Sequence, residues 1–345
     1  MASPLDQLNL TNPVLAAPMA GGPSTPALVA AAAAVGSFGQ LAGGYKTPQL
    51  LAEQIAEVRL RTGRFGVNLF APNPVPVDRE AFRRYADALA PVAQKYGIDL
   101  TAAEPVEDDD HWADKIALLI ADPVAVVSFT FGIPDPATIA ALRRAGTLTI
   151  QTVTSVDEAL LAQGAGVDAL AVQASAAGGH SGTLTPDRPP ASVPLVELLA
   201  AIGAVTSLPL IGAGGLSTAA DIAVALANGA DAVMVGTALL RTDESGASAV
   251  HRAALADSGR GDTVMTRAFT GRPARALPND FIEAYGSDAP SGYPALHHLT
   301  SGLRRAAAAA GNPEHVHLWA GTGYRKARTG PVATVLTDLA AGVTR

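Results

Sequence analysis

Short, uniformly apolar runs alternate with longer segments of mixed polarity along most of the chain. Apolar strands separated by helices are typical of a parallel sheet whose faces are covered. We therefore expect buried strands at residues 14–17, 37–41, 64–69, 124–129, 147–153, 167–172, 209–211 and 232–235, and a short extended piece at 98–104.

The segments between these runs have the spacing of amphipathic helices, and several begin with a capping residue followed by proline. Ser24 or Thr25 precedes Pro26, and Thr47 precedes Pro48. The predicted helices cover residues 27–35, 47–61, 78–96, 111–120, 136–144, 155–163, 193–205, 218–228 and 332–341. Eight strand–helix units favour an α/β fold of the closed (β/α)8 TIM-barrel type over an open sheet.

After residue 235 the alternation of apolar strands with helices becomes irregular. Residues 239–267 are charged with a helical pattern, whereas 269–294 are rich in Gly, Pro, Arg, Asn and Asp. We interpret 240–292 as a smaller, mainly helical inserted cap, and 1–239 with 293–345 as the barrel domain. A further helix is expected at 296–310, followed by a Gly-rich loop at 318–323.

Composition narrows the classes of function. The chain has 345 residues, 48% of them hydrophobic and 16% charged, which is enough apolar sequence for a large core. It has no cysteine, which excludes disulfides, thiolate catalysis and Cys-ligated metals. The net charge of −7 and the scattered basic residues argue against nucleic acid as a partner. The N-terminus lacks a signal-peptide pattern and the longest apolar run is too short to cross a membrane. We therefore expect a cytoplasmic protein without a membrane partner.

Two glycine-rich turns follow the last two predicted strands, at 212–217 and at Gly236-Thr237. In TIM barrels these loops often bind phosphate. Because both turns are predicted to lead into helices, their free N–H groups and the helix dipoles should face an anion. Asn68, Gln173 and the Pro18-Met19 bend end other strands. Together these groups indicate a flat heterocycle across the barrel mouth with its phosphate at the last two loops, as in a barrel that holds FMN.

The stretch from Gln173 to Gly182 follows the sixth predicted strand and carries two glycines and then His180. Paired glycines let the backbone approach a ligand, and a histidine there can act as an acid, base or hydrogen-bond donor. The alternative is a turn with a surface histidine. The remaining six histidines lie on predicted helices or in later loops, and only His315-x-His317 has a spacing that suits a metal. We expect no metal site.

Several motifs of the chain resemble those of the FMN-dependent nitronate monooxygenases, formerly called 2-nitropropane dioxygenases. The similarity extends over most of the chain in order. It is carried by 17–22 (Ala-Pro-Met-Ala-Gly-Gly), 37–39 (Ser-Phe-Gly), 43–45 (Gly-Gly-Tyr), 66–70 (Gly-Val-Asn-Leu-Phe), 177–180 (Ala-Gly-Gly-His), 212–215 (Gly-Ala-Gly-Gly), 236–237 (Gly-Thr), 269–275 (Phe-Thr-Gly-Arg-Pro-Ala-Arg) and 318–321 (Leu-Trp-Ala-Gly).

This resemblance implies a flavoprotein oxidoreductase in which His180 is catalytic. It implies oxidation of an alkyl nitronate by O2 to a carbonyl compound and nitrite, in a chain that can form a homo-oligomer. The residues that it assigns to FMN are Ala17, Pro18, Met19, Asn68, Gln173, Gly178, Gly179, Gly214, Gly215, Met234, Val235, Gly236 and Thr237.

The chain departs from the family pattern at three positions. Ala174 and Ala176 replace a Gly and a Glu, and Met234 stands where a Gln is frequent. The flavin-dependent enoyl-acyl-carrier-protein reductases share the Gly-Gly-His loop. Two alternatives therefore stay open: an NAD(P)H-dependent reductase of enoyl thioesters or quinones, and a flavin-binding protein without turnover.

Overall fold

Eight parallel strands close into a barrel in this computed structural model, which describes residues 3–188 and 190–343. The barrel is closed where β1 pairs with β9, with Val14 opposite Val233 and Leu15 opposite Met234. In order around the barrel the strands are β1 (Val14–Ala16), β2 (Gly39–Ala42), β3 (Phe65–Ala71), β4 (Val126–Phe131), β5 (Leu148–Val153), β6 (Ala169–Gln173), β8 (Leu210–Ala213) and β9 (Ala232–Val235).

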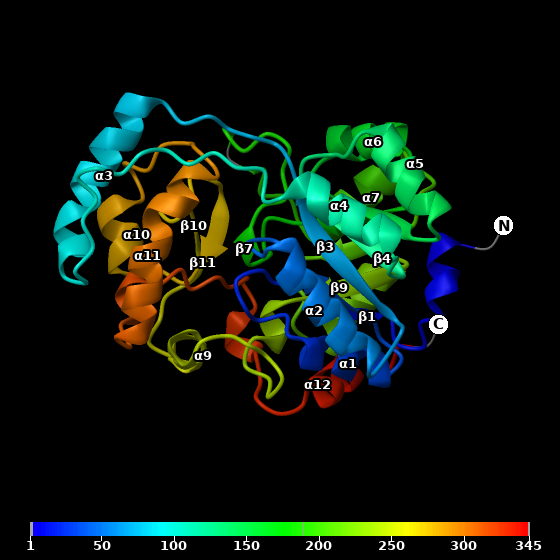
Figure 1. Ribbon diagram of the computed structural model, residues 1–345. Helices are drawn as coiled ribbons and strands as arrows, with labels where there is room; N and C mark the ends of the chain where they lie inside the picture. Colours follow the sequence, from blue (N-terminus) through cyan, green and yellow to red (C-terminus); the bar gives the residue numbers. More distant parts are fainter. Residues whose placement is uncertain (1–2, 189, 344–345) are drawn as a thin grey trace.

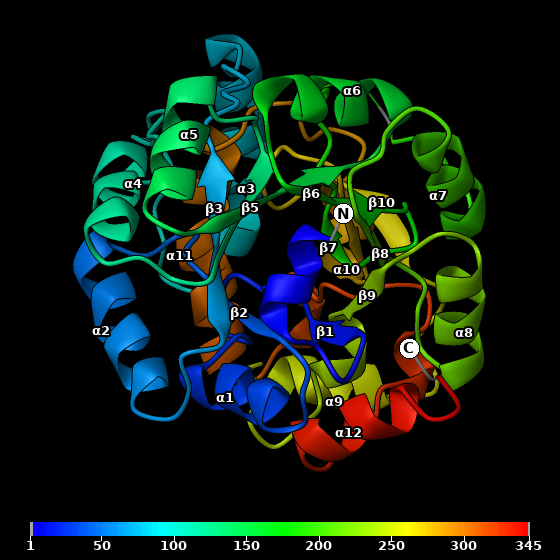
Figure 2. The same ribbon diagram turned by 90° about the vertical axis from the view of Figure 1, so that its right-hand side faces the viewer.

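A ring of helices surrounds the barrel, as Figure 2 shows in a view along its axis. These helices are α1 (Pro26–Ala34), α2 (Pro48–Arg59), α4 (Trp112–Ala121), α5 (Pro136–Arg144), α6 (Val156–Ala165), α7 (Leu195–Gly203), α8 (Ala219–Ala227) and α12 (Val332–Leu339). Thr25 and Thr47 cap α1 and α2, each with a proline in the first turn. The predicted (β/α)8 fold is confirmed.

Side chains pack on both surfaces of the barrel wall. Leu15, Ile150 and Ile211 fill its interior, where Leu5 and Leu8 of the 3-10 helix η1 (Pro4–Leu8) join them. Val14, Val153 and their neighbours on the other surface pack under the helices. The strands are apolar throughout because both of their faces are buried.

A second lobe lies beside the carboxyl ends of the strands (Figure 1). It contains α3 (Arg79–Gln94), α10 (Asp280–Tyr285), α11 (Ala295–Ala309), and a small sheet in which β11 (Ala274–Ala276) lies between β10 (Val264–Thr266) and β7 (Gly179–His180). The remaining elements are α9 (Ala249–Ala256), η2 (Thr237–Leu239), η3 (Pro313–His315) and η4 (Tyr324–Lys326).

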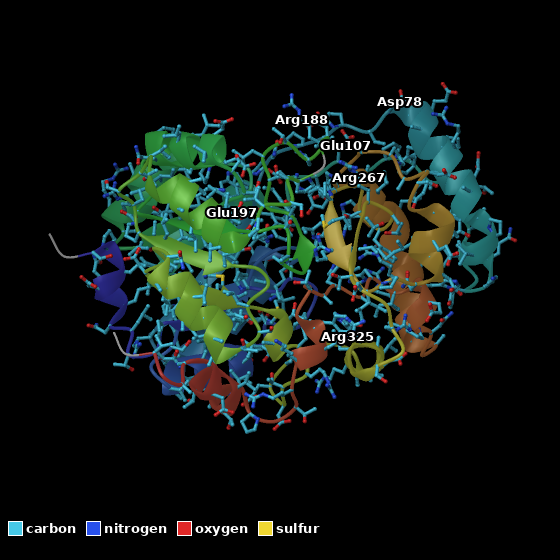
Figure 3. The ribbon with its side chains drawn as sticks, turned by 180° about the vertical axis from the view of Figure 1, so that it is seen from behind. Asp78, Glu107, Arg188, Glu197, Arg267 and Arg325 are labelled. Carbon is cyan, nitrogen blue, oxygen red and sulfur yellow. The ribbon has the colours of Figure 1, made fainter. Side chains whose placement is uncertain are left out.

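Distant segments contribute to an apolar core in this lobe. Phe82 and Tyr85 of α3 pack in the same cluster as Phe269, Phe281 and Leu299. At the junction with the barrel, Arg267 donates to the carbonyl oxygen of Pro186, and Glu107 accepts from the N–H of Val77. Figure 3 labels Arg267 and Glu107 in this region. The division into a barrel and a 240–292 cap stays a prediction, while α3 and α11 pack against that segment.

Two local expectations are wrong. Residues 239–267 are not one helical stretch: the chain turns over residues 240–244, forms α9, and ends in β10. Residues 98–104 form no strand, because the chain turns at Thr101, whose N–H and hydroxyl both donate to Asp99. Within the described residues, no helix is long and apolar enough to cross a membrane.

Candidate active site

A cavity of about 520 Å³ lies at the carboxyl ends of the barrel strands, between the barrel and the second lobe. Every residue that the sequence assigned to a flavin or to catalysis lines it, although these residues come from six separate stretches of chain. They are Ala17, Pro18, Met19, Asn68, Gln173, Gly178, Gly179, His180, Gly214, Gly215, Met234, Val235, Gly236 and Thr237.

His180 is held by the small sheet of the second lobe. It pairs with Ala274 across β7 and β11, and its Nε2 lies 2.9 Å from Oγ1 of Thr270. Within the described residues its Nδ1 has no hydrogen-bond partner. The ring therefore has one nitrogen fixed to the protein and one available to a molecule in the cavity.

The surroundings keep His180 neutral. Burial, followed by the positive charges of Arg272 and Arg304, lowers the pKa of His180 to about 3. Arg272 is fully buried, with its guanidinium 4.0 Å from the ring centre of Phe131 and one nitrogen donating to the carbonyl oxygen of Thr183. A neutral imidazole of low basicity is suited to hydrogen bonding more than to removing a proton.

The two amide side chains at the barrel mouth differ in what they offer. Gln173 is engaged at both ends: its Nε2 donates to the carbonyl oxygen of His180 and its Oε1 accepts from the N–H of Gly182. Asn68 Nδ2 donates to Ser128 and Thr130, which leaves Oδ1 without a partner among the described residues. Asn68 can thus accept a hydrogen bond from a ligand, whereas Gln173 holds the His180 loop in shape.

The glycine loops are shaped by contacts with one another. A Cβ at Gly178 would lie 2.4 Å from the backbone nitrogen of Gly321, and a Cβ at Gly214 would lie 2.8 Å from the carbonyl oxygen of Ala174. Gly214 also has a φ of +104°. The absence of a side chain at Gly178 is therefore explained by the 318–323 loop, which occupies the space beside it.

The expectation that helix dipoles face an anion here is wrong. Asp221 occupies the start of α8, where its carboxylate accepts from the N–H groups of Ser217 and Thr218. The Gly236 loop leads only into the three-residue η2. What remains is backbone: in the described part of the chain no hydrogen bond uses the N–H groups of Gly214, Gly215, Leu216 or Gly236, all of which line the cavity. These loop amides are the donors that a phosphate can use.

The wall of the cavity opposite the glycine loops is aromatic, and few of its residues are predicted from the sequence. Tyr45, Phe131, His297 and Trp319 line it around His180, with Tyr45 stacked on His297 at a centroid distance of 4.0 Å. Tyr45 and Trp319 were identified only as parts of family motifs. A signal existed on α11, where His297, Ser301 and Arg304 follow each other at helical spacing and share one face.

Tyr45 is positioned by the acidic segment at 107–110. The backbone N–H of Tyr45 donates to Oδ1 of Asp110, and Asp110 Oδ2 lies 2.8 Å from the buried Nζ of Lys115. Burial raises the pKa of Tyr45 to about 12, so its hydroxyl remains protonated. Asp110 of this segment therefore connects the backbone of Tyr45 to Lys115 of α4.

The histidines set aside from the sequence are closer to the site than expected. His251, His297 and His317 all line the cavity because α9, α11 and the segment just before the 318–323 loop converge on it. His251 Nε2 lies 3.0 Å from the carbonyl oxygen of Trp319, and His315 contacts Tyr96 outside the cavity. Within residues 3–188 and 190–343, no group of His, Asp or Glu is arranged to hold a metal ion.

Comparisons with known proteins agree with this geometry. The family model described as nitronate monooxygenase matches residues 2–342. A probable nitronate monooxygenase of Staphylococcus aureus (strain Newman) is 37% identical over 340 residues, which cover 96% of this chain and 94% of that protein. The solved nitroalkane oxidase from Streptomyces ansochromogenes is 45% identical with a TM-score of 0.93, covering 98% of this chain and 97% of that one. FabK from Thermotoga maritima is 25% identical with a TM-score of 0.75, covering 98% and 95%.

Proposed function

The chain belongs to the nitronate monooxygenase family of flavin-dependent oxidoreductases, and on this premise we propose that it binds FMN and oxidises alkyl nitronates with O2 to a carbonyl compound and nitrite. The observation that carries the proposal is the single cavity that gathers His180 with all thirteen residues expected to contact FMN.

The donor set suits FMN. The N–H groups of Gly214, Gly215, Leu216 and Gly236 would hold the phosphate, and Asn68 Oδ1 would accept a hydrogen bond from the ring. Met19 and Met234 supply apolar contact on the barrel side. When bound, the flavin supplies the redox chemistry, taking electrons from the substrate and passing them to O2.

His180 would bind the reacting end of the substrate. Its Nε2 is fixed by Thr270, so Nδ1 is the atom that would hydrogen-bond a nitro oxygen. Since its pKa is about 3, the imidazole stays neutral at physiological pH and is a weak base. This favours a substrate that arrives already deprotonated. The aromatic wall of Tyr45, Phe131 and Trp319 would exclude water from the reacting group.

A second candidate is an NAD(P)H-dependent reductase of enoyl thioesters or quinones. The likeness to FabK over 98% of this chain supports it. The relatives of higher identity bear the names nitronate monooxygenase and nitroalkane oxidase, so this candidate ranks second.

One experiment separates these functions. The purified protein should show the visible absorption of oxidised flavin, with FMN as the released cofactor. Under anaerobic conditions an alkyl nitronate should reduce the flavin and so decrease its visible absorption, whereas NADH and NADPH should not. When air is then admitted to the sample with nitronate, nitrite should form. Rapid reduction by NAD(P)H alone would favour the reductase. A colourless protein that FMN does not reconstitute would overturn both.

A further inference from the structure

Arg304 places a guanidinium in the wall of the cavity, on the side opposite the barrel. Only 5% of the residue is exposed, and it lines the cavity from α11. Its Nε donates to Oγ1 of Thr300 at 3.0 Å, and its Nη2 donates to the carbonyl oxygen of His297 at 3.0 Å. In the described chain, Nη1 has no hydrogen-bond partner. The side chain is thus fixed at two nitrogens and free at the third.

No carboxylate balances this charge. Among the described residues Arg304 forms no ion pair, and neither Asp nor Glu lines the cavity. Burial lowers the pKa of Arg304 only to about 10, so it stays charged at neutral pH, while its neighbours His180, His297 and Tyr45 are neutral. A buried cation without a counter-ion is costly, and an anionic ligand would remove that cost.

A second buried arginine shows the contrast. Arg272 also has no ion-pair partner among the described residues, but it does not line the cavity, and its guanidinium stacks on the ring of Phe131. Arg305, next to Arg304 on α11, lines the cavity but is exposed to solvent. Arg304 is therefore the desolvated cation in contact with the cavity, where an interaction with an anion is stronger than in water.

We propose that Arg304 is the specificity-determining residue for the charge of the substrate: its free Nη1 binds the anionic, planar nitronate group that His180 contacts from β7. This inference rests on the proposed function. Nη1 carries two N–H donors next to the delocalised positive charge, so it can form a charge-assisted hydrogen bond with an oxygen of the nitronate group. The same site gives a neutral nitroalkane no charge-assisted hydrogen bond, so the protein should prefer the preformed anion.

Nitrate tests the site without turnover, because it is a planar anion of similar shape to the nitronate group. We would titrate the FMN-loaded protein with nitrate and follow binding by calorimetry and by the flavin difference spectrum. The variants are Arg304→Gln, which removes the charge, and Arg304→Lys, which keeps it. Arg61→Gln is the matched control, since it removes an exposed positive charge that does not line the cavity.

The wild type and Arg61→Gln should bind nitrate equally. Arg304→Gln should weaken binding roughly 10- to 100-fold, the loss typical of a charge-assisted hydrogen bond, and Arg304→Lys should recover part of it. The ratio of kcat/KM for a nitronate to that for its neutral nitroalkane should fall in Arg304→Gln. Equal nitrate affinity in wild type and Arg304→Gln, at equal FMN content, would overturn the inference, as would a wild type that does not bind nitrate. Failure of the proposed function would appear separately, as nitrate binding in a protein that does not oxidise nitronates.

Discussion

The two walls of the cavity are built in different ways. The barrel-side wall consists of strand ends and glycine turns, where backbone N–H groups and small residues such as Ala17 and Gly236 line the cavity. The wall on the side of the second lobe consists of aromatic rings, neutral histidines and one buried cation, Arg304. The first wall is suited to a large cofactor with a phosphate, and the second to a small charged substrate. We therefore propose that cofactor and substrate recognition are divided between the barrel and the second lobe.

The walls also differ in how firmly they are held. Ladder pairs such as Ala16 with Val235 and Gln173 with Ala213 fix the barrel side. The other wall depends on contacts between remote segments, such as the bond of His180 with Thr270 and the stacking of Tyr45 on His297. Substitutions in the two walls should therefore affect different properties.

The largest effect is expected for His180→Ala. It removes the only ring nitrogen proposed to contact the reacting group while leaving the barrel-side wall intact. Nitrite release from a nitronate should fall roughly 100- to 10,000-fold, the range for loss of a positioned hydrogen-bonding or acid–base group. FMN content, measured from the visible spectrum, should stay at the wild-type level.

The matched control for this substitution is His298→Ala. His298 lies on the same lobe, paired with Asp108 at 2.8 Å, and does not line the cavity. It should retain most of the activity. Full nitrite release by His180→Ala, or loss of FMN in step with loss of activity, would show that the division between the two walls is wrong.

The same division separates what the sequence could predict from what it could not. Strands and loops of the barrel follow from local patterns, so Asn68, Gln173 and the glycine turns could be placed at one mouth. Arg304 and His297 could not, because their relation to His180 depends on how the second lobe brings α11 near β7, which lies more than a hundred positions earlier in the chain. Asp221 shows a further limit: its carboxylate takes the N–H groups of Ser217 and Thr218 at the start of α8, so only the N–H groups earlier in the turn remain for an anion, and this is visible only in the structure.

Acidic pH should destabilise the wall of the second lobe selectively. Burial lowers the pKa of His180 to about 3 and that of His251 to about 4, and it also lowers the pKa of His297 and His317. An unfolded histidine has a pKa of about 6.5. Between these values the unfolded chain binds more protons than the folded one, so stability is present above pH 6.5 and is lost as the pH falls toward the folded pKa.

Each of these histidines should lower the free energy of unfolding by about 1.4 kcal/mol per pH unit below 6.5, and hence by about 2 kcal/mol at pH 5. Urea unfolding at pH 7 and pH 5 would measure the loss. A His251→Phe variant should show a smaller difference between the two pH values than the wild type. An identical difference in both proteins would mean that His251 is not held neutral in the folded state.

The smallest effect concerns the joint between the walls. In Gly178→Ala the new Cβ would meet the backbone of Ala320 at 2.5 Å and of Gly321 at 2.4 Å, so the 318–323 loop must move. Such overpacking typically costs about 1–3 kcal/mol of unfolding free energy.

Gly164→Ala is the matched control, because Gly164 lies in α6 with nothing within 4 Å of its Cβ position, and alanine there should be neutral or stabilise by up to about 1 kcal/mol. Because the loop carries Trp319, Gly178→Ala should also raise KM for the nitronate while FMN remains bound. If Gly178→Ala unfolds at the same urea concentration as Gly164→Ala and keeps the wild-type KM, the contact between the His180 loop and the 318–323 loop does not hold the two walls together.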